Sequence, residues 1–368
     1  MASEFHGDRL RLARQFHGFS LTELGERVSA SRQYLHQLET AEKLPTSEMR
    51  AALAQALAVD FYFFSSPLSN PVRIEQTHFR KLRSTTVQVT QEVLSYGTMF
   101  EALVSLLDTV LELPVVNFPE FPVSSEIDIE IAAEKCRVHW GLGVSGPISN
   151  MTRVVENAGA IVAIFDGVSE KVDALSFGRA RPIIMRSTIK ESLFRQRFDI
   201  AHECGHRVMH QGIITGDRLT ENQAHRFAGA FLLPRIQFLR EFPSRHRLDW
   251  QKILELKRRW KVSAAAIFRR AYDLGAINAA QYRKANIHLA NTGQKKREEL
   301  DSEFKLEKPE LLFQCVDVLL SHGGETISSI SAKLGVRPGV INRLIAHAYD
   351  GSQSDVFDGD NVVQFRTR

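Results

Sequence analysis

A pair of histidines four residues apart constrains the fold of this chain more than any other feature. They lie in the stretch RFDIAHECGHRVMH, where Glu203 follows His202 directly and His206 completes an H-E-x-x-H pattern. Residues i and i+4 of an α-helix lie on one face, so both imidazoles can point at a single cation. Glu203 is rotated by about 100° from His202, which puts its carboxylate beside that cation rather than on it. The spacing therefore predicts a helix that carries two metal ligands and a neighbouring general base.

Such a site needs a third ligand from the protein, and the next helical stretch contains one. ENQAHRFAGAFLLP begins at Glu221, fifteen residues after His206, and ends at Pro234. A helix that returns antiparallel to the first could bring Glu221 to the metal, and the hypothesis requires it within about 6 Å of the imidazole pair. The set is typical of a catalytic zinc ion, which activates water for attack on an amide carbon while Glu203 takes the proton.

Two further histidines near this pattern have several possible roles. His225 lies four residues after Glu221 and could replace it as a ligand or assist the oxyanion. His210 lies four residues after His206 but drifts by about 80° from His202, so we expect packing, or contact with a ligand rather than with the metal. A simpler interpretation, in which His202 and His206 are packed core histidines, stays open on the sequence alone.

Four stretches of the sequence carry a resemblance to a known family. They are RPIIMRS, RQRFDIAHECGHRVMH, ENQAHRFAGAFLLP and VSAAAIFRRAYDLGAINAAQYRKA. With them, roughly residues 75–290 resemble the ImmA/IrrE family of zinc metallopeptidases. The resemblance implies that His202, His206 and Glu221 bind Zn²⁺ and that Glu203 is the base. It also implies a narrow protein substrate, often a helix-turn-helix repressor, that is cut at one site under stress.

Residues 21–39 have the pattern of a helix, a tight turn and a second helix. Ser20 and Glu23 stand at the spacing of a capping box, which predicts that the first helix begins after Ser20. Four apolar positions at helical spacing would form the shared core, namely Leu24, Val28, Leu35 and Leu38. In helix-turn-helix proteins the second helix lies in the major groove of DNA, with its first residues facing the bases.

Six polar residues on and around this second helix are candidates for contacts with double-stranded DNA. Arg32 and Gln33 suit base contacts, because a guanidinium pairs with guanine and a side-chain amide with adenine. Gln37 lies one turn further along the same helix. The candidates for phosphate contacts are Ser31, Thr40 and Lys43.

The N-terminal sequence also resembles a known family. The stretch LRLARQFHGFSLTELGERVSASRQYLHQLETAEKLPTSEMRAALAQALAV is similar to the λ-repressor-like (Xre-type) DNA-binding domains, although Ala41 replaces the glycine that many relatives have there. Residues 1–60 carry seven Lys/Arg against eight Asp/Glu, a weak electrostatic footprint for a DNA binder. A helical bundle used only for protein contacts therefore stays open as an alternative.

Composition narrows the remaining possibilities. The chain has 368 residues with 43% hydrophobic and 24% charged residues, which is typical of a globular protein of two or three domains. Apolar runs such as GAIVAIF are far shorter than the roughly 20 residues of a membrane span, and the first residues do not resemble a secretory signal. Three widely spaced cysteines do not form a disulfide framework. We therefore expect a cytoplasmic protein without a membrane partner.

The fold class expected from these patterns is α+β and mostly helical. A charge step near residue 295 separates twelve Lys/Arg against two Asp/Glu in 252–297 from seven against twelve in 298–368, and it marks a boundary. Consecutive strands are expected at 159–167, 173–178 and 181–187, and a long helix at 91–113. The expected domains are an all-α helix-turn-helix bundle at 1–66, a zincin-like peptidase with a small sheet at 67–292, a small helical domain at 293–350 and a flexible tail at 351–368.

The sequence supports two functional hypotheses. The first is a DNA-binding regulator with zinc-dependent endopeptidase activity, which cleaves a specific protein such as a helix-turn-helix repressor. The second is an Xre-type repressor or antitoxin whose peptidase domain is silent or cuts only its own chain, with a toxin–antitoxin partner. A homodimer is possible in both cases. The helical region near 327–345 could hold a second helix-turn-helix, a dimerisation module or a regulatory module.

Overall fold

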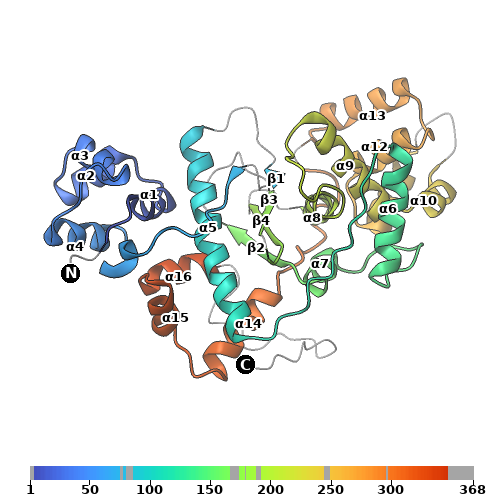
Figure 1. The fold of residues 1–368 in the computed structure, drawn as a ribbon. Coiled ribbons are helices and arrows are strands. Elements are labelled where there is room, and N and C mark those ends of the chain that lie inside the picture. The colour runs from blue at the N-terminus through green and yellow to red at the C-terminus, as the bar shows by residue number, and fades with distance from the viewer. Residues whose placement is uncertain are drawn as a thin grey trace.

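The described part of the chain is mostly helical, with one small sheet near the middle and the N-terminal helices to one side of it, as Figure 1 shows. The computed structural model describes residues 4–74, 78–79, 86–165, 174–178, 180–187, 192–243, 249–295 and 297–346. The expected class, α+β and mostly helical, is confirmed. The stretch 351–368, expected to be a flexible tail, lies outside the described residues.

The N-terminal bundle contains the expected helix-turn-helix. Ser20 Oγ accepts a hydrogen bond from the Glu23 backbone N–H at 3.1 Å, and the Glu23 carboxylate accepts one from the Ser20 N–H at 2.7 Å, so the capping box is confirmed. The core positions Leu24, Leu35 and Leu38 are fully buried. The elements are α1 (Gly7–Phe16), α2 (Leu21–Val28), α3 (Arg32–Glu39), α4 (Ser47–Ala56) and the 3₁₀ helix η1 (Phe61–Ser65).

Two backbone positions shape the chain on either side of α3. A Cβ atom at Gly25 would lie 2.4 Å from the carbonyl oxygen of Ala30, so only glycine allows the tight turn between α2 and α3. Ala41 follows α3 and has a φ of 60°, in the left-handed region that favours glycine. The glycine of many relatives would therefore adopt this conformation with less strain than the alanine of this chain.

Four short strands form one mixed sheet in the order β1-β3-β4-β2. β3 pairs antiparallel with both β1 and β4, whereas β2 runs parallel to β4. The three expected strands are confirmed, each somewhat shorter than predicted, but β1 was not predicted because two residues carry no detectable period. The strands are β1 (His78–Phe79), β2 (Ile161–Phe165), β3 (Ala174–Phe177) and β4 (Ile183–Ser187).

The sheet separates two hydrophobic cores, because successive side chains of a strand point to opposite faces. On β2, Ile161 and Ala163 belong to the first core while Val162 belongs to the second. On β4, Ile183 and Ile184 divide in the same way. The first core continues into the N-terminal bundle and the C-terminal helices, and the second extends over the helices that follow the sheet.

The long helix α5 (Val87–Val110) joins the N-terminal bundle to the sheet. Phe16 of α1 stacks on Tyr96 of α5 with ring centroids 5.6 Å apart, and a Cβ atom at Gly97 would lie 3.2 Å from the ring of Phe177 on β3. By length and composition alone α5 could cross a membrane, and half of its apolar window is buried inside the protein. Its apolar character is accounted for by packing between two parts of the same core.

The C-terminal helices pack against the first core as well. Val59 and Val336 form an isolated antiparallel β-bridge, and the Arg343 guanidinium donates a hydrogen bond to the carbonyl oxygen of Phe16 at 2.9 Å. Two of the helices follow each other through a turn in which Gly335 has a φ of 66°. The elements are α14 (Leu311–Ser321), α15 (Ile327–Leu334) and α16 (Pro338–Ile345).

The charge step near residue 295 corresponds to a buried ion-pair cluster. Lys257 Nζ lies 2.7 Å from the Glu298 carboxylate and 2.8 Å from the Asp301 carboxylate. Glu298 also accepts a hydrogen bond from the backbone N–H of Ala264 at 2.7 Å. The acidic segment is therefore held against the basic segment, and the opposite charges of the two segments are paired across the step.

The helix pair α8 (Leu193–Met209) and α9 (Arg218–Leu232) carries the H-E-x-x-H pattern and its expected partner. A Cβ atom at Gly205 would lie 2.9 Å from the ring of Phe227, so the glycine inside the pattern lets α9 approach α8 closely. The other helices of this part are α6 (Glu126–His139), α7 (Met151–Asn157), α10 (Arg235–Glu241), α11 (Trp250–Trp260), α12 (Ala264–Asp273) and α13 (Ala279–Asn291).

Candidate functional site

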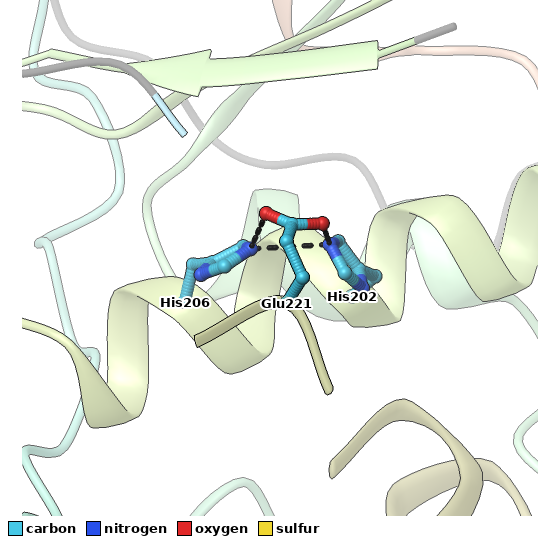
Figure 2. A group of neighbouring side chains, drawn as sticks. All are labelled: His202, His206 and Glu221. Carbon is cyan, nitrogen blue, oxygen red and sulfur yellow. Dashed lines mark hydrogen bonds and ion pairs between the residues drawn. The ribbon is translucent and has the colours of Figure 1, made fainter. Parts of the chain in front are cut away.

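Three side chains from α8 and α9 converge on one point. His202 Nε2 lies 3.4 Å from Glu221 Oε2, His206 Nε2 lies 3.3 Å from Glu221 Oε1, and the two Nε2 atoms are 3.1 Å apart. Figure 2 shows the carboxylate facing both rings across the helix pair. One donor atom from each residue lies within 4.8 Å of the others, so the group could hold a metal ion. Two imidazole nitrogens and a carboxylate are donors that zinc prefers.

The protonation states of these groups suit a cation. His202 is 3% exposed and His206 is 1% exposed, so water hardly reaches either ring. Burial lowers the pKa of His206, which keeps its imidazole neutral with a lone pair available. Burial raises the pKa of Glu221, but hydrogen bonds to the two histidines outweigh it and hold the pKa well below its ordinary value. A neutral imidazole and an ionised carboxylate are the forms that bind a metal.

Glu203 lies beside this group rather than in it. It is 2% exposed, and its carboxylate accepts a hydrogen bond from the hydroxyl of Ser176 on β3. Among the described residues, the group that could hold a metal ion consists of His202, His206 and Glu221 without Glu203. The sheet therefore orients the carboxylate of the residue that directly follows His202.

The two additional histidines, His210 and His225, contact different members of the candidate metal-binding group. His210 Nδ1 lies 2.9 Å from His206 Nδ1, and His210 Nε2 lies 2.8 Å from the side-chain oxygen of Gln223. The His225 ring contacts His202, with ring centroids 4.5 Å apart. His210 thus contacts the candidate ligand His206 directly, and the side chain that faces both Nε2 atoms is Glu221 rather than His225.

Sequence reasoning missed Ser176 and Gln223. Ser176 lies on a strand 27 residues before the glutamate that it contacts, and nothing in the strand pattern distinguishes it. Gln223 lies two residues after Glu221, a spacing that does not by itself predict a contact with His210 on the other helix. Only the packing of the sheet and of α9 on α8 reveals these two contacts.

The residues predicted to contact DNA lie on the surface of the N-terminal bundle. Arg32 and Gln33 are exposed in the first turn of α3, and Gln37 is half-buried. Lys43 is exposed, with its Nζ atom 5.9 Å from the centroid of the Tyr34 ring. Apart from Gln37, these side chains are open to solvent.

Two of the predicted phosphate contacts are engaged within the bundle. The Ser31 hydroxyl accepts a hydrogen bond from the Tyr34 backbone N–H at 3.1 Å and so caps α3. The Thr40 hydroxyl donates to the carbonyl oxygen of His36 at 3.0 Å and lies 3.0 Å from the Glu42 carboxylate. A phosphate would have to compete with these local hydrogen bonds.

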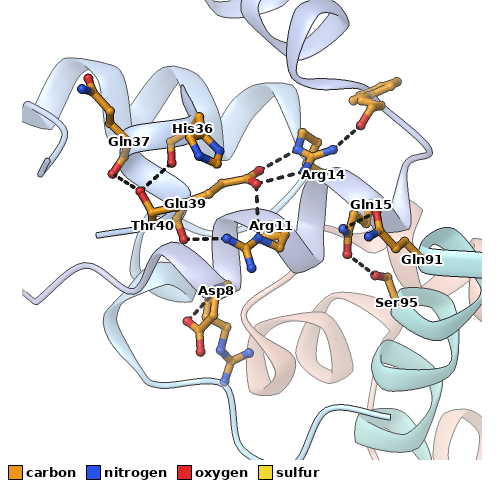
Figure 3. Close-up of polar contacts among 12 residues, drawn as sticks. Asp8, Arg11, Arg14, Gln15, His36, Gln37, Glu39, Thr40, Gln91 and Ser95 are labelled. Atoms are coloured by element: carbon orange, nitrogen blue, oxygen red, sulfur yellow. Dashed lines mark hydrogen bonds and ion pairs between the residues drawn. The ribbon is translucent and has the colours of Figure 1, made fainter. Parts of the chain in front are cut away.

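A buried ion pair, which the sequence reasoning did not identify, fixes α3 against α1. The Glu39 carboxylate accepts hydrogen bonds from Arg14 at 2.6 Å and 2.9 Å and from Arg11 at 3.4 Å, as Figure 3 shows. The side chain of Glu39 is 3% exposed and that of Arg14 is 11% exposed. The orientation of the second helix of the helix-turn-helix therefore depends on a desolvated carboxylate.

Fold and site together define a helix-turn-helix domain joined to a metallopeptidase-like domain. Comparison with protein families agrees with this class: residues 7–60 match the model of a helix-turn-helix domain, and residues 155–272 match that of the IrrE N-terminal-like domain of the Peptidase_M78 family. No curated protein matches the chain. Both resemblances seen in the sequence, and their fusion in one chain, are confirmed.

Proposed function

We propose that this protein is a DNA-binding regulator with zinc-dependent endopeptidase activity that cleaves a specific protein, such as a helix-turn-helix repressor. One observation carries the proposal: His202, His206 and Glu221 converge within 4.8 Å beside the buried carboxylate of Glu203. Buried polar groups at this density are costly unless they serve a ligand or each other. The helix-turn-helix domain supports a role in transcription, and a cytoplasmic location follows from access to DNA.

Zinc suits the three donors, which His202, His206 and Glu221 would supply. Bound there, zinc would supply Lewis acidity to polarise the carbonyl of a scissile peptide bond. Glu203 would accept a proton from the attacking water and pass it to the leaving nitrogen. The hydroxyl of Ser176 holds the Glu203 carboxylate in place, and the surrounding core excludes bulk water.

On the DNA side, α3 would lie in the major groove of an operator. Arg32 and Gln33 would face the base edges, with Gln37 one turn along, while Lys43 would reach a phosphate. Ser31 and Thr40 would contact the backbone only by sharing their local hydrogen bonds. A homodimer would place two copies of α3 on neighbouring half-sites of a palindromic operator.

The test uses the purified full chain and the protein product of a neighbouring gene as the substrate. Wild-type protein should contain about one zinc ion per chain and should cut the substrate at one site unless a chelator is added. Glu203→Gln should retain zinc and lose at least about 100-fold in cleavage rate, since a general base contributes that much or more. Glu134→Gln, an exposed position on α6, is the matched control and should cleave normally. Cleavage by Glu203→Gln at the wild-type rate would refute the assigned base.

A second candidate function is that of a repressor or antitoxin whose peptidase domain is silent or cuts only its own chain. Its support is the backbone of β1, which pairs antiparallel with β3 so that residue 78 lies opposite Ser176. An extended substrate adds to a free strand edge, and here the chain's own segment occupies the edge next to Glu203.

The two candidates differ in what the wild-type protein does when it is incubated alone. Self-cleavage would release fragments whose masses place the cut near residues 78–79, and Glu203→Gln would abolish them. A silent domain would leave the chain intact, with operator binding lost in the Arg32→Ala, Gln33→Ala double variant and unchanged in Glu203→Gln. A gel shift on the DNA upstream of the gene measures this.

A further inference from the structure

Three side chains, those of Gln223, His210 and His206, are linked by hydrogen bonds from α9 to one of the proposed metal-binding nitrogens. Gln223 Oε1 lies 2.8 Å from His210 Nε2, and His210 Nδ1 lies 2.9 Å from His206 Nδ1. His206 Nε2 then lies 3.3 Å from Glu221 Oε1 at the candidate metal position. Both rings are buried, His210 at 2% and His206 at 1% exposure, so water does not compete for these contacts.

The side chain of Gln223 decides which atom donates in each of these hydrogen bonds. The side-chain oxygen of Gln223 has no proton and can only accept, so His210 Nε2 must carry the hydrogen between them. A neutral imidazole carries one N–H, so His210 Nδ1 is then an acceptor. His206 Nδ1 must therefore donate, which leaves the lone pair of His206 on Nε2, the atom that faces Glu221.

We propose that Gln223 and His210 are positioning residues that fix the tautomer and the ring orientation of His206, so that its Nε2 lone pair is directed at the metal ion. The inference rests on the proposed metal site, and it adds two residues to the set on which metal binding depends. Histidine ligands commonly donate their second N–H to a carbonyl, carboxylate or water, and loss of such a partner weakens metal binding about 10- to 100-fold. Here the imidazole of His210 is the acceptor for His206. The side-chain oxygen of Gln223 keeps the proton of His210 on Nε2.

The arrangement also ties the two sides of the site together. Glu221 and Gln223 both lie in the first two turns of α9, while His206 lies in the last turn of α8 and His210 is the residue that caps it. A shift of α9 would therefore move the carboxylate ligand and the acceptor for His210 at the same time. Metal affinity should report on the packing of the helix pair, which Gly205 makes possible.

The experiment measures zinc affinity of the full-length protein by competition with a chromophoric chelator. Gln223→Leu removes the acceptor and should weaken zinc binding about 10- to 100-fold. Gln223→Glu keeps an acceptor at the same position and should bind zinc at least as tightly as wild type. Asn222→Leu, its exposed neighbour on α9, is the matched control and should not change the affinity. Circular dichroism of the metal-free variants shows whether each one is folded.

A second measurement reads the tautomers directly. In zinc-loaded wild-type protein with ¹⁵N-labelled histidine, long-range ¹H–¹⁵N spectra should show His206 protonated on Nδ1 and His210 on Nε2. Gln223→Leu should give a mixture of tautomers at His210. A zinc-loaded wild-type His210 protonated on Nδ1, or equal zinc affinity in wild type and Gln223→Leu, overturns the proposal. Wild-type protein that binds no zinc overturns the metal site itself, and this inference with it.

Discussion

The helix-turn-helix and the α8–α9 pair each consist of two consecutive helices. The candidate functional side chains are exposed in the first pair and buried in the second. At the candidate metal site, His202 and His206 are buried and face a carboxylate 3.3–3.4 Å away. On α3, Arg32 and Gln33 are exposed. Folding alone brings the buried donors together, whereas the exposed side chains of α3 gain their contacts only when a partner such as DNA binds. Residue spacing therefore says much about the metal site and little about which bases a helix reads.

Because of this difference, substitutions in the two regions should impair different properties of the protein. A change among the buried donors should remove a ligand and leave the other domain intact. A change on the exposed face of α3 should weaken DNA binding without affecting stability. The buried ion pair of Glu39 is the exception in the N-terminal bundle, because it is structural although it lies on the helix that would read DNA.

The largest expected effect is at the metal site. Glu221→Ala removes the carboxylate that faces both imidazoles, and zinc affinity should fall by more than the roughly 100-fold limit for an indirect partner. Chelator competition measures the affinity, and a gel shift on the same protein should give unchanged DNA binding. Tight zinc binding by this variant would mean that another residue completes the site, with His225 the first to examine.

The next effect is on the stability of the N-terminal bundle. Glu39→Ala leaves Arg14 without its buried partner, and breaking such a pair costs about 3–5 kcal/mol. The melting temperature of the protein should fall, with zinc content unchanged. Glu26→Ala, an exposed position on α2, should melt like wild type. Equal melting of the two variants would show that the ion pair does not hold α3 against α1.

DNA affinity should respond to the exposed face of α3. Arg32→Ala should cost about 1–3 kcal/mol of specific binding, or about 5- to 150-fold in Kd, because a guanidinium contact to a base is lost. Lys43→Ala should weaken binding to specific and to non-specific DNA to a similar extent, as expected for a phosphate contact. Fluorescence anisotropy with operator and scrambled duplexes distinguishes the two patterns, and identical losses on both duplexes for Arg32→Ala would rule out base reading by that residue.

The smallest effect should come from the helix cap. Ser31→Ala removes the acceptor of the Tyr34 backbone N–H, and loss of such a cap costs about 1 kcal/mol. Thermal unfolding should show a slightly lower melting temperature than in Thr22→Ala, an exposed position on α2. If Ser31→Ala instead loses DNA affinity at full stability, the hydroxyl contacts a phosphate rather than serving mainly as the cap.

The sequence predicted the parts of this structure that depend on spacing along one helix. The i, i+4 histidines, the capping box at Ser20 and the apolar core of α2 and α3 all follow from helical periodicity, which is local. The match of Glu221 to the histidine pair needed a guess about the next helix, and an antiparallel return made it reasonable.

Contacts between distant segments could not be predicted in the same way. Ser176 reaches Glu203 only because β3 lies against α8, and Glu39 meets Arg14 only because α1 crosses α3. The two-residue strand β1 is too short to have a pattern. The charge step near residue 295 coincides with a contact that the sequence did not predict, because Lys257 pairs with Glu298 and Asp301 across it.

The shared first core has a practical consequence for dissecting this protein. Phe16 of the N-terminal bundle packs on Tyr96 of α5, and the end of the bundle forms a β-bridge with Val336 near the other end of the chain. A fragment cut after residue 66 would expose the surface that these residues cover, and it would be prone to aggregate. Truncated variants would thus report on solubility, and the two proposed activities are better separated by single substitutions in the intact polypeptide.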